Sequence, residues 1–291
     1  MTTDAPASPR FLTTKEVAEL LRVKERKVYD LVAAEEIPHR RITGKLLFPR
    51  AEIAAWIEGE AAQAAPVSPA LLAGSHDPLL EWAVRESGCG LATLFDGSMD
   101  GLDRFAAGAA GVAGVHIPDA GGWNVETLRE RGLKQCVLIA WAARSQGLIL
   151  GEGAAAAAGL SDLRGRRLVA RQAGAGSGAL FARLAAAEGL TSADFSVTSM
   201  PARTETEVAA AVAAGEADAA LGLAAMARQF RLAFRPLVEE RFDLLLDRRF
   251  YFTEPAQILF AFTATAAFGE KAAALGGYDI GALGEVRWLS P

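Results

Sequence analysis

The sequence is poor in the residues that build disulfide frameworks and metal centres. Its two cysteines, Cys89 and Cys136, are too few for a disulfide framework and are predicted to be partly buried thiols. Its three histidines are His39, His76 and His116, and none stands at metal-ligand spacing from a cysteine or from another histidine. We therefore expect neither disulfide bonds nor a metal site.

Long hydrophobic runs are also missing. No apolar segment approaches the roughly 20 residues that a membrane-spanning helix needs. The first ten residues, MTTDAPASPR, lack the basic segment and apolar core of a signal peptide, and we expect a flexible tail there. These absences predict a cytoplasmic protein without membrane attachment, and 291 residues allow two or three compact units.

The net charge of −5 is unevenly distributed along the chain. Residues 22–50 contain eight lysines and arginines but only four acidic residues, so this segment has a charge of +4 within an acidic chain. A local basic segment favours binding to a polyanion, and the alternative is a solvated surface without a partner.

The segment FLTTKEVAELLRVKERKVYDLVAAEEIP predicts two short helices joined by a tight turn at residues 22–24. Thr13 or Thr14 can cap the first helix, and Glu16 stands where an acid opposes the helix dipole. Pro38 ends the pair. Apolar residues recur at helical spacing on one face of each helix, namely Val17, Leu20 and Leu21 in the first and Val28, Leu31 and Val32 in the second.

A hairpin and a third helix are predicted to follow. The segment HRRITGKLLFPR has two β-prone runs around Thr43-Gly44, and Pro49 can open a helix with Ile53, Trp56 and Ile57 on its inner face. This order is that of a winged helix-turn-helix, whose second helix enters the major groove and whose wing contacts phosphates. The candidate DNA contacts on those two parts are Arg26, Lys27, Tyr29, Arg40, Arg41 and Lys45.

The segment from Leu12 to Ile57 (LTTKEVAELLRVKERKVYDLVAAEEIPHRRITGKLLFPRAEIAAWI) resembles the excisionase and MerR-type helix-turn-helix family in motif order and spacing. The resemblance implies binding to double-stranded DNA through the six side chains named above, while Glu35 and Glu36 would discourage DNA nearby. Because such domains usually dimerise on paired half-sites, we expect a homodimer. We place this domain at residues 11–59 and a linker at residues 60–69.

From residue 70 onward, apolar segments alternate with helical ones. Leu91–Phe95 and VAGVHIPD predict strands, and QCVLIAWAARSQGLIL predicts a pair of β-prone runs. Such alternation favours an α/β domain with largely parallel sheets and helices on both faces. Ligands of such sheets bind at the carboxyl ends of strands, where loops lead into helices.

Three loops of this kind carry serine, at Ser75-His76, Gly97-Ser98 and Gly176-Ser177-Gly178. Helix N-termini with free N–H groups and a hydroxyl attract anions without a formal positive charge. This matters because residues 61–291 contain 20 lysines and arginines against 25 acidic residues. The alternative for each serine is an ordinary N-cap.

Four phrases, HIPDAGGWNVETL, AWAARSQGLIL, GLSDLRGRRLVARQAGAGSG and VAAAVAAGEADAALGL, occur in an order that resembles type II periplasmic binding proteins. More narrowly, Ala70 to Phe252 is similar to the binding-protein-like domains of molybdate-related regulators and molybdopterin-synthesis proteins. The resemblance implies two lobes joined by two crossings, with lobe I at residues 70–143 and 236–291 and lobe II at residues 144–235. The expected fold class is a mainly α winged helix-turn-helix followed by a two-lobed α/β domain.

The resemblance also implies where a small anionic ligand would bind. Carried over onto this sequence, the cleft residues are Ser75, His76, Gly97, Ser98, Arg144, Arg171, Gly176, Ser177 and Thr204. Two departures bear on the ligand, because the loop RQAGAGSG looks one residue longer than the usual form and Glu205 stands where related domains offer a histidine. A carboxylate would repel a dianion, so either Glu205 points away from the cleft or the ligand is not molybdate.

Two other interpretations compete with this one. Gly174 to Ala179 fits the dinucleotide-binding pattern G-x-G-x-x-[GA], but Asp194 precedes the next strand, whereas a ribose-binding acid should end it. A nucleophile elbow fails because Ala175 and Ala179 occupy its glycine positions. An excisionase-like architectural DNA-binding protein would need no ligand cleft.

The sequence thus predicts a ligand-responsive transcriptional regulator and not an enzyme, with no cofactor and no catalytic residues. The resemblance favours molybdate or tungstate as the ligand. A small organic acid or a molybdenum-cofactor-related molecule is the alternative.

Overall fold

The computed structural model of the protein describes residues 11–34, 36–42, 44–54, 56 and 68–291. The chain forms two compact units, residues 1–66 and 67–291, which we call the N-terminal and C-terminal units. The predicted tail at residues 1–10 and most of the predicted linker at residues 60–69 lie outside the described residues, as do Glu35, Thr43 and Ile57.

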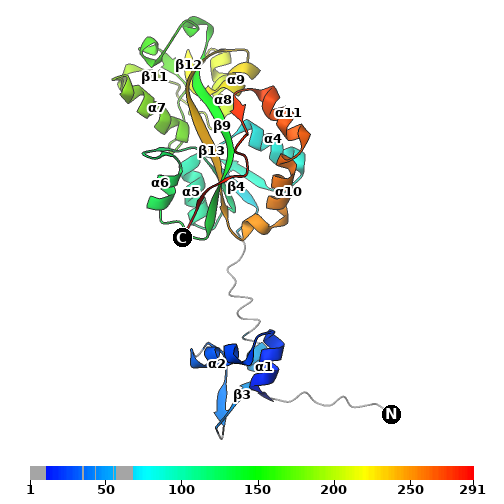
Figure 1. Cartoon of the computed structure of the whole chain (residues 1–291). Coiled ribbons are helices and arrows are strands. Elements are labelled where there is room, and N and C mark those ends of the chain that lie inside the picture. Colours follow the sequence, from blue (N-terminus) through cyan, green and yellow to red (C-terminus); the bar gives the residue numbers. More distant parts are fainter. Residues whose placement is uncertain (1–10, 35, 43, 55, 57–67) are drawn as a thin grey trace. The chain divides into compact units, whose positions relative to one another are not determined.

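The N-terminal unit consists of a helix pair, a three-stranded antiparallel sheet and a third helical segment (Figure 1). Its elements are β1 (Phe11–Leu12), α1 (Thr14–Leu21), α2 (Glu25–Ala33), β2 (Arg40–Ile42) and β3 (Lys45–Pro49), followed by helical residues at 50–54 and 56. The winged helix-turn-helix plan is therefore confirmed. β1 was not predicted, because two residues are too few to show a strand period.

The predicted start and turn of the helix pair are also confirmed. Thr13 is the N-cap of α1 and forms a capping box with Glu16, and Arg22 takes the left-handed conformation at φ 53° that ends the helix. Leu20 was predicted on the buried face but is exposed. In this two-turn helix Val17 and Ala18 face the core, which places Leu20 beyond its edge.

The C-terminal unit is built on one ten-stranded sheet whose order is β11-β10-β12-β9-β13-β6-β4-β5, with β14 and β15 paired to β9. The strands are β4 (Leu71–Gly74), β5 (Ala92–Phe95), β6 (Val112–Val115), β9 (Cys136–Leu150), β10 (Arg167–Leu168), β11 (Ser196–Val197), β12 (Ala219–Leu223), β13 (Ala233–Asp247), β14 (Tyr278–Asp279) and β15 (Val286–Leu289). A separate small ribbon is formed by β7 (Pro118–Asp119) and β8 (Gly122–Trp123).

Helices cover this sheet. They are α4 (Pro78–Ser87), α5 (Ser98–Ala106), α6 (Val125–Glu130), α7 (Gly176–Ala187), α8 (Glu205–Ala213), α9 (Ala224–Gln229), α10 (Glu254–Thr263) and α11 (Ala266–Leu275). Short 3₁₀ turns are η1 (Glu152–Ala154), η2 (Leu160–Leu163), η3 (Ser192–Asp194) and η4 (Phe250–Phe252). We call β4–β6, α4–α6, α10 and α11 lobe I, and β10–β12 with α7–α9 lobe II.

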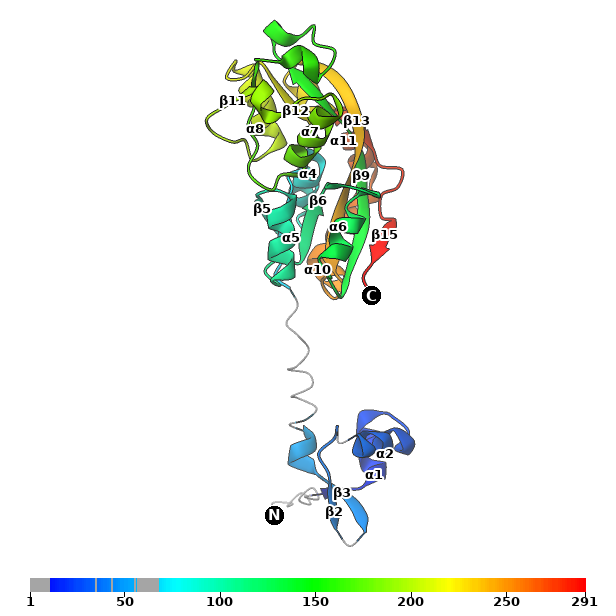
Figure 2. The ribbon, with the colours of Figure 1, turned by 90° about the vertical axis from the view of Figure 1, so that its left-hand side faces the viewer.

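The long strands β9 and β13 run side by side through both lobes (Figures 1 and 2). β4, β5 and β6 are parallel to one another, as are β10, β11 and β12, but β9 and β13 are antiparallel to their neighbours. The prediction of largely parallel sheets is therefore wrong for the centre of the sheet. The reason is that one crossing strand leaves lobe I and the other returns to it.

β9 is one strand of 15 residues where the sequence suggested two runs. Its polar middle, Arg144 to Gln146, interrupts the apolar pattern in the sequence. In the fold this segment stays in the sheet, because Arg144 is buried against carboxylates from distant parts of the chain.

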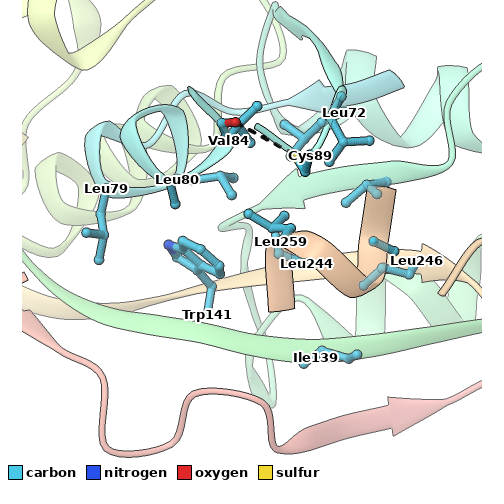
Figure 3. Packing of buried hydrophobic residues seen from close by; sticks show 14 of the residues in the cluster. Leu72, Leu79, Leu80, Val84, Cys89, Ile139, Trp141, Leu244, Leu246 and Leu259 are labelled. Carbon is cyan, nitrogen blue, oxygen red and sulfur yellow. Dashed lines mark hydrogen bonds between the residues drawn. The ribbon is translucent and has the colours of Figure 1, made fainter. Parts of the chain in front are cut away.

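Both faces of β9 are buried. Trp141 packs with α4 and α10 on one face, near Leu80 and Leu259 (Figure 3), and Leu138 packs with α5 and α6 on the other. Cys89 and Cys136 lie in these two cores as free thiols, as predicted, and burial raises the pKa of Cys136.

Among the described residues, no single helix has the length and hydropathy to cross a membrane. α10 and α11 meet those two criteria only as a pair, and the pair is bent by 68°.

Candidate functional site

The exposed face of α2 carries three of the predicted DNA contacts. Arg26, Lys27 and Tyr29 are exposed, whereas Val28 and Val32 on the other face are buried. Within the described part of the chain, neither cation has an acidic partner. Cations in such surroundings are available to the phosphates of a nucleic acid.

The wing carries the other three. Arg40 donates to both carboxylate oxygens of Glu52, at 2.8 and 3.0 Å. Arg41 and Lys45 are exposed and pair with no acid among the residues that the structure describes. Arg40 would have to release Glu52 before it bound a phosphate, so Arg41 and Lys45 are the better candidates.

In the C-terminal unit, the predicted cleft residues other than Arg144 on β9 lie on four loops that each lead into a helix. Ser75-His76 precedes α4, Gly97-Ser98 opens α5, residues 174–177 open α7, and Thr204-Glu205 opens α8. The first two loops belong to lobe I and the last two to lobe II. The side chains of Ser75, His76, Ser98, Ser177 and Glu205 are all buried.

Polar contacts join the loops of the two lobes. The backbone N–H of Glu205 donates to His76 Nδ1 at 3.2 Å, so we assign the proton of this imidazole to Nε2, which lies 3.1 Å from Glu81 Oε2. Arg203 of lobe II pairs with Asp96 of lobe I at 2.5 Å. The structure therefore brings His76 together with the start of α8.

The glycine loop of lobe II also touches lobe I. The Met99 N–H donates to the Gly174 carbonyl at 3.2 Å. A Cβ at Gly176 would lie 2.4 Å from the carbonyl oxygen of His116, and a Cβ at Gly97 would lie 3.2 Å from the Ala175 Cα. Gly97 and Gly176 thus act through close backbone approach between the lobes.

Arg144, predicted as an anion contact, is already neutralised. Its guanidinium donates to Asp77 Oδ2 at 2.9 Å and to Glu240, and it stacks over the Phe242 ring at 4.3 Å. Burial alone would lower the pKa of Arg144, but Glu240 and Asp77 raise it above its usual range. This cation is permanent, and two carboxylates balance it.

Arg171 and Glu205 form the second charged group of the cleft. Arg171 Nη1 lies 3.2 Å from Glu205 Oε1, and the Arg171 side chain is 11% exposed. Glu205 is buried beside this arginine rather than exposed to solvent. Glu205 Oε2 and Arg171 Nε have no hydrogen-bond partner among the described residues.

Only one of the three predicted serines is unengaged. The Ser75 and Ser98 hydroxyls lie 2.8 Å apart in a hydrogen bond, and Ser98 Oγ also accepts from the His116 N–H at 3.2 Å. Ser177 Oγ is buried and has no partner within the described part of the chain. The ligand contacts at Ser75, Ser98 and Ser177 stay predictions, and of the three hydroxyls only that of Ser177 lacks a partner among the described residues.

The alternative that these serines are ordinary N-caps is wrong. Asp77 caps α4, Gly97 precedes α5 and Ala175 precedes α7, so none of the three serines caps its helix. Thr204, predicted as a ligand contact, is the residue that does cap, because its hydroxyl accepts from the Glu207 N–H at 3.1 Å.

The cleft also contains residues that were not predicted, among them His116, Glu240 and Gln146. His116 Nδ1 lies 2.9 Å from Glu240 Oε2, which extends the Arg144 network towards the glycine loop. Both amide atoms of Gln146 are buried without a described partner. His116 follows strand β6 just as Ser75 follows β4, so its position at a strand end was a signal in the sequence. For Gln146, the sequence offered no signal other than its position two residues after Arg144.

The charged side chains of the cleft include more carboxylates than arginines. Two arginines, Arg144 and Arg171, face three carboxylates from Asp77, Glu205 and Glu240. No group of three or more histidine, cysteine or acidic side chains able to hold a metal ion occurs among the residues that the structure describes.

Asp194, the candidate ribose-binding acid, is engaged locally. Its carboxylate accepts from the Thr191 N–H and hydroxyl at 2.8 and 3.1 Å in the turn before β11. This position precedes the strand, so the dinucleotide interpretation gains no support from it.

The chain was compared with protein families and with known proteins. A helix-turn-helix domain model matches residues 11–61, and a PBP superfamily domain model matches residues 80–264. No curated protein matches the chain.

Solved structures similar to the chain have low sequence identity. The alkanesulfonate-binding protein SsuA from Xanthomonas axonopodis pv. citri is 16% identical, with a TM-score of 0.46 over 72% of this chain and 78% of that one. The regulatory domain of MetR, a LysR family regulator from N. meningitidis, is 11% identical, with a TM-score of 0.47 over 72% of this chain and 96% of that one.

The match to residues 80–264 covers more than half of the sequence, and a helix-turn-helix domain precedes it. The chain therefore belongs to the PBP superfamily.

Proposed function

We propose that the protein is a transcriptional regulator whose C-terminal unit senses a small molecule and whose N-terminal unit binds double-stranded DNA. One observation carries the sensing part. Ser177 Oγ, Glu205 Oε2 and the Gln146 amide are buried polar atoms without a partner among the described residues. Buried polar groups are almost always hydrogen-bonded, so each of these atoms calls for a partner, and a bound ligand would supply one.

The DNA-binding part rests on the exposed cations. Arg26 and Lys27 on α2, with Arg41 and Lys45 on the wing, supply positive charge to the DNA. We expect the regulator to act as a homodimer, because one such domain contacts only one half-site.

The resemblance favours molybdate or tungstate, but the charges of the cleft favour the organic alternative. A dianion beside Arg171 would lie close to Glu205, and both arginines already have carboxylate partners. An organic molecule with both donors and acceptors matches the unpartnered atoms better than an acceptor-only oxyanion does.

Coupling between ligand and DNA would run through lobe closure. A ligand shifts a conformational equilibrium only as far as it prefers one state. The contacts of His76 with Glu205 and of Asp96 with Arg203 hold the two lobes together, so a ligand between them favours the closed arrangement.

The test starts from a duplex selected by the full chain from a random DNA pool. Calorimetric titrations of the full chain with molybdate, tungstate, sulfate and a panel of organic acids and amino acids would then be repeated with Ser177→Ala. Binding that is lost in the variant and that changes DNA affinity supports the proposal. DNA binding that no bound ligand alters would favour an excisionase-like architectural role.

A further inference from the structure

A cavity of about 210 Å³ adjoins the unpartnered polar atoms of lobe II. Most of its wall is apolar and includes Leu168, Phe181, Phe195 and Leu221. Phe181 and Phe195 meet edge to face, with ring centroids 5.4 Å apart. The wall therefore suits an apolar group, and it offers little to an inorganic oxyanion.

One corner of this cavity is polar. Arg171 and Ser177 both line it, and Arg171 Nε and Ser177 Oγ are donors without partners among the described residues. Ser177 stands in the first turn of the 12-residue helix α7, where free N–H groups favour a negative charge. This corner can take a carboxylate.

An acceptor lies beside the same corner. Glu205 Oε1 contacts Arg171 at 3.2 Å, while Oε2 is buried and has no described partner. A ligand made only of acceptors would leave this oxygen unsatisfied and would be repelled by it. A ligand with a cationic N–H donor next to its carboxylate would satisfy it.

We infer that the ligand of the cleft is a small organic zwitterion with an apolar side group, of which an apolar α-amino acid is the simplest example. Its ammonium binds Glu205 Oε2, its carboxylate binds Ser177 Oγ and Arg171 Nε, and its side group enters the cavity. The inference rests on the proposed function, because it names the ligand class of the same cleft.

The size of the cavity limits that side group. An apolar protein cavity of about 150 Å³ is large enough to hold benzene. At about 210 Å³, this cavity accommodates an isobutyl or a phenyl group. We therefore use L-leucine and L-phenylalanine as probes.

The experiment is a calorimetric titration of the full chain with these two amino acids and with two partial analogues of phenylalanine. 3-Phenylpropanoate lacks the ammonium, and 2-phenylethylamine lacks the carboxylate. We expect the amino acid to bind at least about a hundredfold more tightly than either analogue, because each analogue leaves buried polar atoms unpaired. Equal binding of 3-phenylpropanoate, or no binding of either amino acid to the folded chain, would overturn the inference.

Two sets of variants assign the contacts. Glu205→Gln should abolish the preference for phenylalanine over 3-phenylpropanoate, which a merely structural role would not do. Ser177→Ala should weaken the binding of both compounds.

Because Arg171 loses its partner in Glu205→Gln, a second test avoids that pair. A Cβ at Gly178 would meet nothing within 4 Å, and Gly178 lines the cavity. Gly178→Leu should therefore prevent phenylalanine from binding, while the control Gly178→Ala should still bind it. Equal binding of phenylalanine by the two variants would contradict the placement of its side group in the cavity.

The same samples separate this inference from the proposed function. If phenylalanine binds but leaves DNA affinity unchanged at saturation, the ligand class stands and the regulatory role fails. If tungstate or sulfate changes DNA affinity through Ser177 and the amino acids do not bind, the regulatory role stands and the zwitterion is excluded.

Discussion

Arginine side chains have contrasting surroundings in the two units. Arg26 and Arg41 in the N-terminal unit are exposed and have no acidic partner among the described residues. Arg144 in the C-terminal unit is buried between Asp77 and Glu240. The first arrangement leaves positive charge for an external polyanion, whereas the second balances it inside the protein. A cation in a cleft is therefore not evidence for an anionic ligand until its partners are known.

The largest expected effect comes from breaking the buried arrangement. Arg144→Met should lower the free energy of unfolding of the C-terminal unit by roughly 3–5 kcal/mol, because it removes the buried cation that Asp77 and Glu240 share. Urea denaturation followed by circular dichroism would measure it. The control is Arg40→Met, which removes the exposed ion pair with Glu52 and should cost less than about 1 kcal/mol. Similar losses in the two variants would contradict the contrast.

A buried acid that forms no direct ion pair among the described residues, Asp243, sharpens the same contrast. Burial raises the pKa of Asp243 to about 6, despite the hydrogen bond that it accepts from Asn124 Nδ2 at 2.7 Å. Because the folded-state pKa lies above the unfolded value, the protonated carboxyl is favoured by folding and the penalty appears as the pH rises through about 6. Asp243→Asn keeps an acceptor for Asn124 and should stabilise the protein by up to about 3 kcal/mol at pH 8.

This stabilisation should shrink as the pH falls below about 6 and should disappear well below the unfolded pKa of 3.8, where Asp243 is protonated in both states. Thermal unfolding of the variant and the original protein across pH 4–8 would show the difference growing with pH. A difference that stays constant over this range would mean that the carboxyl does not titrate as described.

On the exposed side, Arg26→Ala should weaken DNA binding by roughly 1–3 kcal/mol. If the contact is to a phosphate, the slope of log affinity against log salt should also decrease by about one. Fluorescence anisotropy with a selected duplex would measure both. Arg85→Ala removes an exposed arginine of the C-terminal unit and should change neither.

The smallest expected effect separates a cap from a ligand contact. Thr204→Ala removes the N-cap of α8 and should cost about 1 kcal/mol of stability without changing ligand affinity. Ser177→Ala should weaken ligand binding without lowering the stability of the protein. Thermal unfolding and calorimetric titration of the two variants, side by side, would show whether the roles are assigned correctly.

Local rules predicted the N-terminal unit well. The capping box at Thr13, the turn at Arg22 and the buried Val17 and Val28 all follow from interactions within a few residues. Leu20 was misplaced because helical periodicity does not show how far the core extends along a short helix.

The cleft was predicted only in outline. The loops that form it could be located, because each follows a strand and opens a helix. The charge balance of the cleft could not be predicted from the sequence, because Arg144 contacts Asp77 and Glu240, which lie 67 and 96 residues away along the chain. For the same reason, the sequence could not show that Ser75 and Ser98 are hydrogen-bonded to each other and that Ser177 has no partner among the described residues.

The most direct test of the central claim is the affinity of the full chain for a selected DNA duplex, measured with and without saturating L-phenylalanine. We predict a change of at least about fivefold in either direction for the original protein and none for Ser177→Ala. An affinity that stays the same at saturation, for phenylalanine and for every other compound that calorimetry shows to bind, would contradict the claim that the cleft controls DNA binding.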